Sequence, residues 1–185
     1  MIFLLKPKQK KKKINNEDVG VYLSHLFFIN TLNKQHTMNI LKEILLYIWQ
    51  LPQNLLGLIL IAIYKPEKDK LVLDNGNVVY FSKNMPGGIS LGKYSIINSY
   101  YAGLKTGNKT RLEDSVLKEL DVVKHEGLGH GTQSRMLGPL YLLVIGLPSV
   151  IWAWMYGTVI PYTHNGYYVF YTEKWADRLG GVVRK

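Results

Sequence analysis

Cysteine is absent from this chain of 185 residues. Its absence excludes disulfide bonds and thiolate metal sites, so any bound zinc would be held by His, Asp or Glu. Charged residues are absent from two long stretches, residues 44–64 and residues 136–163. The apolar fraction of 47% is nevertheless ordinary for a folded protein. The length suits one domain with appendages.

The net charge of +10 is unevenly distributed, because residues 1–37 hold seven Lys and two acidic residues. The run KPKQKKKK, from Lys6 to Lys13, lacks the interleaved aromatic residues of a single-strand-binding surface. It is more typical of a solvated tail, and we expect no nucleic-acid partner. We therefore predict that residues 1–37 form a disordered, dispensable basic extension or follow a mis-assigned start. Residues 38–185 would then form a single domain.

The first charge-free stretch, residues 44–64, is long enough to cross a membrane. Its 21 residues would span about 30 Å as a helix. Gln50, Pro52, Gln53 and Asn54 lie in its middle, however, where polar groups and a helix breaker are costly in lipid. A membrane span and a kinked, interfacial helix pair both fit this stretch.

A second apolar helical segment is expected at residues 136–160. It contains Pro139 and Pro148, together with two tryptophans. Either it is a second membrane segment, or it is a buried hydrophobic helix pair broken at Pro148. The sequence leaves both possibilities open.

Between the apolar segments, the pattern indicates a small antiparallel sheet. Asn75-Gly76 separates two apolar, β-branched runs within residues 71–81, which predicts a hairpin with a type I′ turn. Residues 88–97 predict a third strand, interrupted by Gly92. Together with the helices, these strands predict an α+β fold with a small antiparallel sheet and a helical half.

The most informative stretch is KHEGLGHGTQSR, residues 124–135. It nearly matches the zinc-binding motif His-Glu-x-x-His, in which two histidines four residues apart bind one ion and the Glu polarises a water. Apolar residues at helical spacing precede it, so we expect it to lie on a helix. Here His125 and His130 are five residues apart.

That spacing is incompatible with a straight α-helix. At about 100° per residue, His125 and His130 would point roughly 140° apart instead of roughly 40°. A π-bulge would absorb the extra residue and bring both imidazoles to one side. Gly127, Gly129 and Gly131 either make the backbone pliant enough for this bulge or mark a broken helix end with structural histidines.

Later carboxylates can complete a site. Catalytic zinc usually has three protein ligands and one open position. Glu173, on a helix predicted within residues 167–181, is the candidate third ligand beside His125 and His130. Asp177, one turn further on, would orient a ligating imidazole, and Glu126 would be the general base.

Taken together, HE, GHGTQS and EKWAD resemble the gluzincin type of zinc metallopeptidase, in which His-Glu-x-x-His is completed by a downstream Glu-x-x-x-Asp. The resemblance covers residues 122–181 and extends to small membrane proteins of bacteria. It implies one zinc ion held by His125, His130 and Glu173, with Glu126 as base and Asp177 as orienting partner. It also implies a peptide or protein substrate and a location at the bacterial inner membrane, with a cytoplasmic location left open.

The leading hypothesis is therefore a membrane-associated zinc metallopeptidase with a metallopeptidase-like helical half. One alternative is a catalytically silent membrane-associated protein that keeps this fold for structural or partner-binding purposes. Another is a cationic surface-binding protein that acts through its lysine tail. Weaker site candidates are His164, a loop histidine, and three tyrosines near the predicted final helix, Tyr167, Tyr168 and Tyr171.

Overall fold

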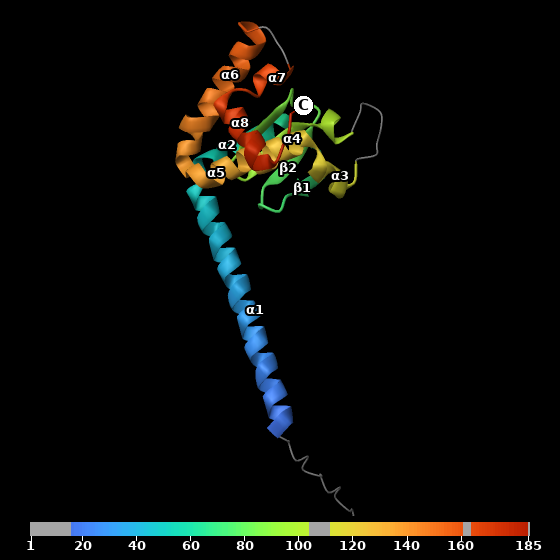
Figure 1. Ribbon diagram of the computed structural model, residues 1–185, viewed down its shortest axis with the longest axis vertical. Helices are drawn as coiled ribbons and strands as arrows, with labels where there is room; N and C mark the ends of the chain where they lie inside the picture. The colour runs from blue at the N-terminus through green and yellow to red at the C-terminus, as the bar shows by residue number, and fades with distance from the viewer. Residues whose placement is uncertain (1–15, 104–111, 161–163, 185) are drawn as a thin grey trace, which may run out of the picture. The chain divides into compact units, whose positions relative to one another are not determined.

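A computed structural model describes residues 16–103, 112–160 and 164–184 of the chain. The chain divides into two compact units, residues 1–43 and residues 44–185. All of the candidate site residues lie in the second unit, whose helices and sheet are seen in Figure 1. The fold is α+β, as the sequence predicts.

The helical elements of the described residues are α1 (Asn16–Trp49), α2 (Leu51–Tyr64), the 3₁₀ turn η1 (Ser99–Ala102), α3 (Asp114–Glu119), α4 (Asp121–Val123), the π-helical segment η2 (Lys124–His130), α5 (Gly131–Leu137), the 3₁₀ turn η3 (Gly138–Leu140), the π-helical segment η4 (Leu142–Gly146), α6 (Leu147–Thr158), α7 (His164–Tyr167) and α8 (Tyr171–Gly180). The strands are β1 (Lys70–Val72), β2 (Val78–Ser82), β3 (Gly88–Leu91) and β4 (Tyr94–Asn98).

The basic extension is helical where the structure describes it. Residues 16–37, which the sequence predicts to be disordered, belong to α1. Residues 1–15, with the lysine run, lie outside the described residues. The boundary between the two units follows Glu43, six residues beyond the predicted one.

The sheet is mixed, and the prediction of a three-stranded antiparallel sheet is wrong. Its four strands have the order β1-β2-β4-β3, with β2 and β4 parallel. The predicted third strand is in fact a second hairpin, because Gly92 has a φ of 63° and the strands pair from Leu91 to Tyr94. A two-residue turn with glycine at positive φ in its first position reverses the chain there.

The predicted β1–β2 hairpin is confirmed, but its type I′ turn is wrong. Gly76 has a φ of 79°, whereas Asn75 is not among the residues with positive φ. The amide of Gly76 donates to the Leu73 carbonyl, and the amide of Leu73 donates to the Asn77 carbonyl. This is a three-residue loop in which only Gly76 needs the left-handed region.

The hydrophobic core lies between the sheet and the helices that follow it. Leu117 from α3 and Val123 from α4 are fully buried. Leu120 separates these helices, because its ψ of 130° is extended. The remaining buried members of this cluster come from the first hairpin and β4: Leu71, Leu73, Val79, Phe81 and Ile97. The core thus fixes η2, which continues directly from α4, against the sheet.

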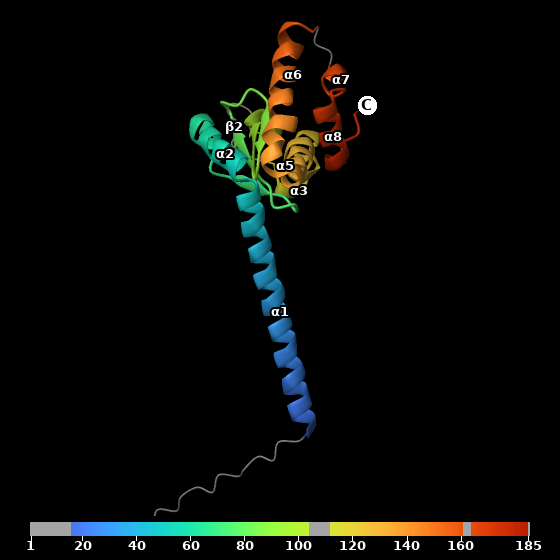
Figure 2. The same cartoon turned by 90° about the vertical axis from the view of Figure 1, so that its left-hand side faces the viewer.

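The two apolar segments are both interrupted. Gln50 separates the end of α1 from α2. In the second segment, Gly138, whose φ is 54°, ends α5, and the chain bends by 118° between Leu140 and Leu142. The predicted break at Pro148 is wrong, because Pro148 fits the first turn of α6. Figures 1 and 2 both show α6 beside α8. No single helix of the described chain is long and apolar enough to cross a membrane, although two bent helix pairs reach that length together.

Candidate metal centre

Three side chains that can bind a metal meet between η2 and α8. One ligand atom from each of His125, His130 and Glu173 lies within 4.8 Å of the others. Oε2 of Glu173 is 3.1 Å from Nε2 of His125 and 3.5 Å from Nε2 of His130. Ligands placed tetrahedrally about 2.0–2.1 Å from a zinc ion would be about 3.4 Å apart. The observed separations are close to that value.

The helix widens where the histidines require it. η2 is π-helical over all seven residues from Lys124 to His130. An i+5 turn places residues five apart one above the other. The ring centroids of His125 and His130 are accordingly 4.8 Å apart. Of the two alternatives that the sequence left open, the structure contains the widened helix and not the broken helix end.

Side chains from the sheet hydrogen-bond to the carbonyls of the widened turn. The Ser90 hydroxyl on β3 lies 2.9 Å from the carbonyl oxygen of Glu126. Nδ2 of Asn75, in the first hairpin loop, donates to the carbonyl of Gly127 over 2.9 Å. Backbone groups inside a protein need such partners. Asn75 thus serves η2 in addition to forming the turn.

The glycines of η2 allow close packing. A Cβ atom on Gly129 would lie 2.4 Å from the carbonyl oxygen of Ala176 in α8. One on Gly180 of α8 would lie 2.5 Å from the carbonyl oxygen of Lys124. One on Gly127 would lie 2.2 Å from Leu73. The small residues therefore bring α8 and the sheet against η2, which puts Glu173 within reach of the histidines.

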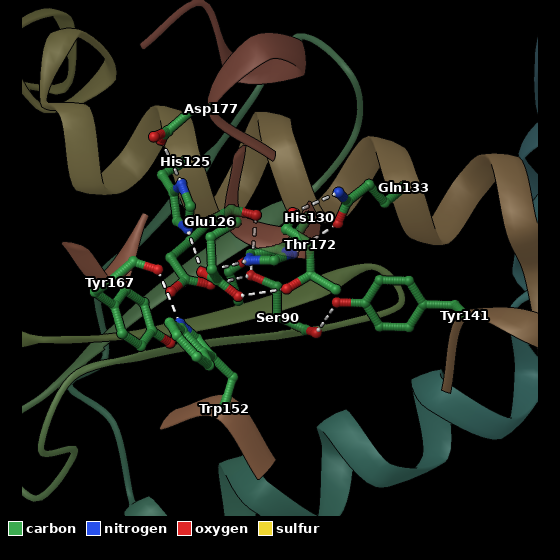
Figure 3. Close-up of polar contacts among 12 residues, drawn as sticks. Ser90, His125, Glu126, His130, Gln133, Tyr141, Trp152, Tyr167, Thr172 and Asp177 are labelled. Carbon is green, nitrogen blue, oxygen red and sulfur yellow. Dashed lines mark hydrogen bonds and ion pairs between the residues drawn. The ribbon is translucent and has the colours of Figure 1, made fainter. Parts of the chain in front are cut away.

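Each imidazole is held through its second nitrogen. Nδ1 of His125 is 2.7 Å from Oδ1 of Asp177, and Nδ1 of His130 is 2.7 Å from Oε1 of Gln133, as Figure 3 shows. Gln133 in turn donates to the Thr172 carbonyl over 2.9 Å. Such hydrogen bonds fix the tautomer and turn both Nε2 atoms toward Glu173. The role of Asp177 agrees with the prediction, whereas Gln133 was not assigned to the site.

Arg184 extends the hydrogen-bonded chain behind His125. Its Nη2 donates to Oδ1 of Asp177 over 2.8 Å, and its Nε donates to Oδ2 over 3.0 Å. Its guanidinium also lies 3.5 Å from the ring centroid of Tyr168. A bidentate Arg–carboxylate pair of this kind fixes the orientation of the acid. No periodicity or motif in the sequence pointed to Arg184.

The electrostatics of the cluster favour the charged forms of His125 and Glu173. Burial alone would lower the pKa of His125, but hydrogen bonds with Asp177 and Glu173 outweigh it and raise this pKa to about 9. Burial would likewise raise the pKa of Glu173, but the two histidines hold it well below its usual range. A protonated His125 thus supplies the positive charge between the carboxylates when no other cation does.

The remaining carboxylates are also oriented. Oγ1 of Thr172 donates to Oε1 of Glu173 over 3.0 Å, which leaves Oε2 directed at the histidines. Oε2 of Glu126 lies 2.8 Å from the Ser90 hydroxyl. A Cβ atom on Gly88 would lie 2.3 Å from Oε1 of Glu126, so the carboxylate rests directly against β3.

A cavity of about 450 Å³ borders the cluster. Glu126, His130 and Glu173 line one part of it, and the whole of β3 lines another. Most of the remaining wall is apolar and comes from α2, η4 and α6: Leu56, Leu142, Leu147, Val150 and Ala153. A molecule in this cavity would contact the candidate base and two of the three candidate ligands.

The weaker sequence candidates have different positions. Tyr167 lines the cavity, and the ring of Tyr168 lies with its centroid 5.3 Å from that of His125. The hydroxyl of Tyr171 donates to the carbonyl of Val144, away from the ligands. The backbone of His164 belongs to α7, and its side chain lies outside the described residues.

The chain matches no protein-family model, and neither the curated proteins nor the solved structures contain a significant match to it. The chemistry of this site therefore rests on its own geometry. That geometry offers two imidazoles and a carboxylate to one ion, beside an oriented glutamate and a cavity.

Proposed function

We propose that the chain is a zinc-dependent peptidase. The observation that carries the proposal is the convergence of His125, His130 and Glu173 across a π-helical turn, at the wall of a cavity that Glu126 also lines. Two imidazoles, one carboxylate and an adjacent glutamate are the donor set of catalytic zinc in peptidases. The resemblance to gluzincins in residues 122–181 supports the same reading.

The three ligands would hold the ion, and the ion would supply Lewis acidity. Asp177 and Gln133 keep both Nε2 atoms available, because each accepts the proton of the opposite ring nitrogen. His125 loses its extra proton when it binds a cation, which is why an ion can replace the charge of the imidazolium.

Glu126 would act as the general base. Its carboxylate is held between Ser90 and the backbone of β3 and faces the cavity. It would take a proton from the attacking water and deliver it to the leaving amine. Holding the base in place before substrate binds reduces the entropic cost of the reaction.

A peptide is the favoured substrate because β3 is an edge strand of the sheet and lines the cavity. An extended peptide can pair with the backbone of such a strand. The Tyr141 hydroxyl already donates to the carbonyl of Ser90 over 2.9 Å, so this carbonyl points away from β4. A peptide beside Gly88 would lie next to the carboxylate of Glu126.

The experiment combines metal analysis with a peptidase assay on the full chain. We expect about one zinc per chain and metal-dependent cleavage of a peptide library. Glu126→Gln should keep the zinc and lose cleavage by roughly 10²–10⁴-fold. Glu119→Gln, an exposed acid paired with Lys124, is the matched control and should change neither property.

A catalytically silent metal site is the second candidate. The observation in its favour is the deep burial of all three ligands, which are 2–6% exposed. Retention of zinc with no cleavage of any peptide, and no effect of Glu126→Gln on any measured property, would establish this alternative. Absence of bound metal together with unchanged behaviour of His130→Ala would reject both.

A further inference from the structure

Helix α2 has its polar residues inside and its apolar residues outside. Gln53 and Asn54 are fully buried, whereas Leu55, Ile59 and Ile63 are 52%, 53% and 61% exposed. These three aliphatic residues are four apart and form one stripe along the helix. A surface helix in water has the opposite arrangement, whereas polar residues of helices in lipid face the protein interior.

The polar contacts of α2 fix this orientation. Nε2 of Gln53 donates to the carbonyl of Gly138 over 2.7 Å and lies 3.2 Å from the Ser134 hydroxyl. Oδ1 of Asn54 accepts the backbone amide of Lys93 over 2.7 Å. Because these bonds join α2 to the β3–β4 turn and to α5, the helix cannot rotate its aliphatic stripe inward without breaking them.

A second apolar stripe runs along η4 and α6. Leu143, Leu147, Val150 and Trp154 are 54–66% exposed and recur at helical spacing. No charged residue occurs between Met136 and Thr163, or between Ile44 and Tyr64. We define the apolar face as the two stripes: Leu55, Ile59 and Ile63, with Leu143, Leu147, Val150 and Trp154.

Both helices border the same opening. Leu56 of α2 and Leu147 and Val150 of α6 all line the cavity, and each is also at least 42% exposed. These residues therefore form the rim of the cavity mouth. The exposed surface around the entrance to the candidate site is aliphatic on both sides.

We propose that the apolar face inserts into the interfacial region of a lipid bilayer. α2 and α6 have 14 and 12 residues, so each is only about 18–21 Å long, too short for a hydrocarbon core of about 30 Å, and would lie along the interface of one leaflet. A folded protein partner, including a second copy, would close the cavity mouth, whereas fluid hydrocarbon leaves it open. The binding itself requires no metal and no hydrolysis; access of substrate from the lipid side rests on the proposed function.

The experiment measures flotation of the full chain with phosphatidylcholine vesicles and with vesicles that also contain phosphatidylglycerol. Leu55→Glu combined with Ile59→Glu should weaken binding to both kinds of vesicle by at least about tenfold, because two aliphatic groups that would lie in the bilayer become charges. Val116→Glu, at a 46% exposed apolar position on α3, is the matched control and should bind as the parent chain does.

The absence of cysteine permits a second measurement. In single variants Ile59→Cys and Val150→Cys, an environment-sensitive dye is attached to the new thiol. Its fluorescence emission should shift to the blue when vesicles are added, and brominated lipid should quench it. The same dye attached in Val116→Cys should show neither the blue shift nor the quenching. Equal quenching at all three positions would overturn the proposal. So would binding that needs phosphatidylglycerol and survives the Glu pair, since it would then come from the basic extension.

Self-association is read from the same samples. The dye emission of Ile59→Cys could be blue-shifted without vesicles while analytical ultracentrifugation shows a dimer. That result would assign the apolar face to a second copy of the chain and would also overturn the proposal. Because none of these readouts depends on zinc or cleavage, failure here leaves the peptidase proposal intact, and failure of the peptidase assay leaves this one intact.

Discussion

The described residues include two π-helical segments, and only one of them carries candidate metal ligands. η2 carries His125, Glu126 and His130, whereas η4, residues 142–146, has apolar side chains. In both, a polar side chain from elsewhere lies within hydrogen-bond distance of a carbonyl of the widened turn: Ser90 and Asn75 at η2, and Tyr171 at η4. A widened turn by itself is therefore a feature of the backbone, and it offers a candidate metal centre only where ligating residues and a helix bearing a carboxylate meet it.

The glycines of the two segments give the largest expected contrast. Gly129→Ala would push a methyl group into the backbone of Ala176 and separate α8 from η2. We expect a loss of about 1–3 kcal/mol in unfolding free energy and a loss of bound zinc. Urea unfolding and metal analysis test both.

Gly146→Ala in η4 is the matched control. The nearest atoms to the new methyl group would be 3.7 Å away, which is ordinary contact. We expect unchanged stability or a gain of up to about 1 kcal/mol, because alanine favours a helix over glycine. Equal effects of the two substitutions would show that Gly129 is not needed for the close approach of α8 to η2.

The expected pH dependence of metal binding arises from η2, since η4 has no ionisable side chain. His125 must lose a proton to bind a cation, and its pKa in the metal-free protein is about 9. Zinc affinity should therefore rise roughly tenfold per pH unit up to about pH 9 and then level off. Competition with a chelator of known affinity at several pH values measures this slope.

The stability of the metal-free protein should show the opposite trend. Because folding raises the pKa of His125 from 6.5 to about 9, its contribution is complete below about pH 6.5 and is lost as the pH rises through about 9. His125→Gln should remove this dependence. A metal-free protein whose unfolding free energy is flat over this range would contradict the charge assignment.

The hydrogen bonds behind the ligands should have intermediate effects. Asp177→Asn should weaken zinc binding about 10–100-fold, because the amide no longer fixes the tautomer of His125. Arg184→Ala should have a smaller effect in the same direction, partly restored by Arg184→Lys. The visible spectrum of the cobalt-substituted protein reports the same ligands and should shift with Asp177→Asn.

The smallest contrast concerns the hydrogen bonds to the widened turns. Ser90→Ala leaves a buried carbonyl without its hydroxyl neighbour and should cost about 1–2 kcal/mol of unfolding free energy. Tyr171→Phe removes the exposed donor to Val144 and should cost less than about 0.5 kcal/mol. A larger effect for Tyr171→Phe would mean that η4, and not η2, depends on its external donor.

Much of the candidate site could be predicted because its residues belong to local patterns. The spacing of His125 and His130 made a widened helix one of two possibilities, and Glu173 and Asp177 lie one turn apart on a helix that ends at Gly180-Gly181. Ser90, Gln133 and Arg184 could not be assigned in this way. Each is brought to the cluster by packing between elements distant in sequence, and single residues of these types have no spacing signal.

The sheet shows the same limit. Asn75-Gly76 located the reversal of the first hairpin but fits more than one turn type, and in the structure Asn75 also bonds the distant Gly127 carbonyl. Gly92, expected to interrupt a single strand, instead forms the turn of a second hairpin. The parallel pairing of β2 with β4 depends on which strands become neighbours. That is decided by core packing between hairpins and helices.

The sequence by itself determined which residues are candidate metal ligands and limited the motif to a widened turn or a broken helix end, because both follow from residue type and spacing along one element. Tertiary structure alone decided that α8 approaches η2 closely enough for Glu173 to reach two imidazoles, and that α2 turns its glutamine and asparagine inward. Both outcomes depend on contacts between segments far apart in the chain, whose energies no local pattern encodes.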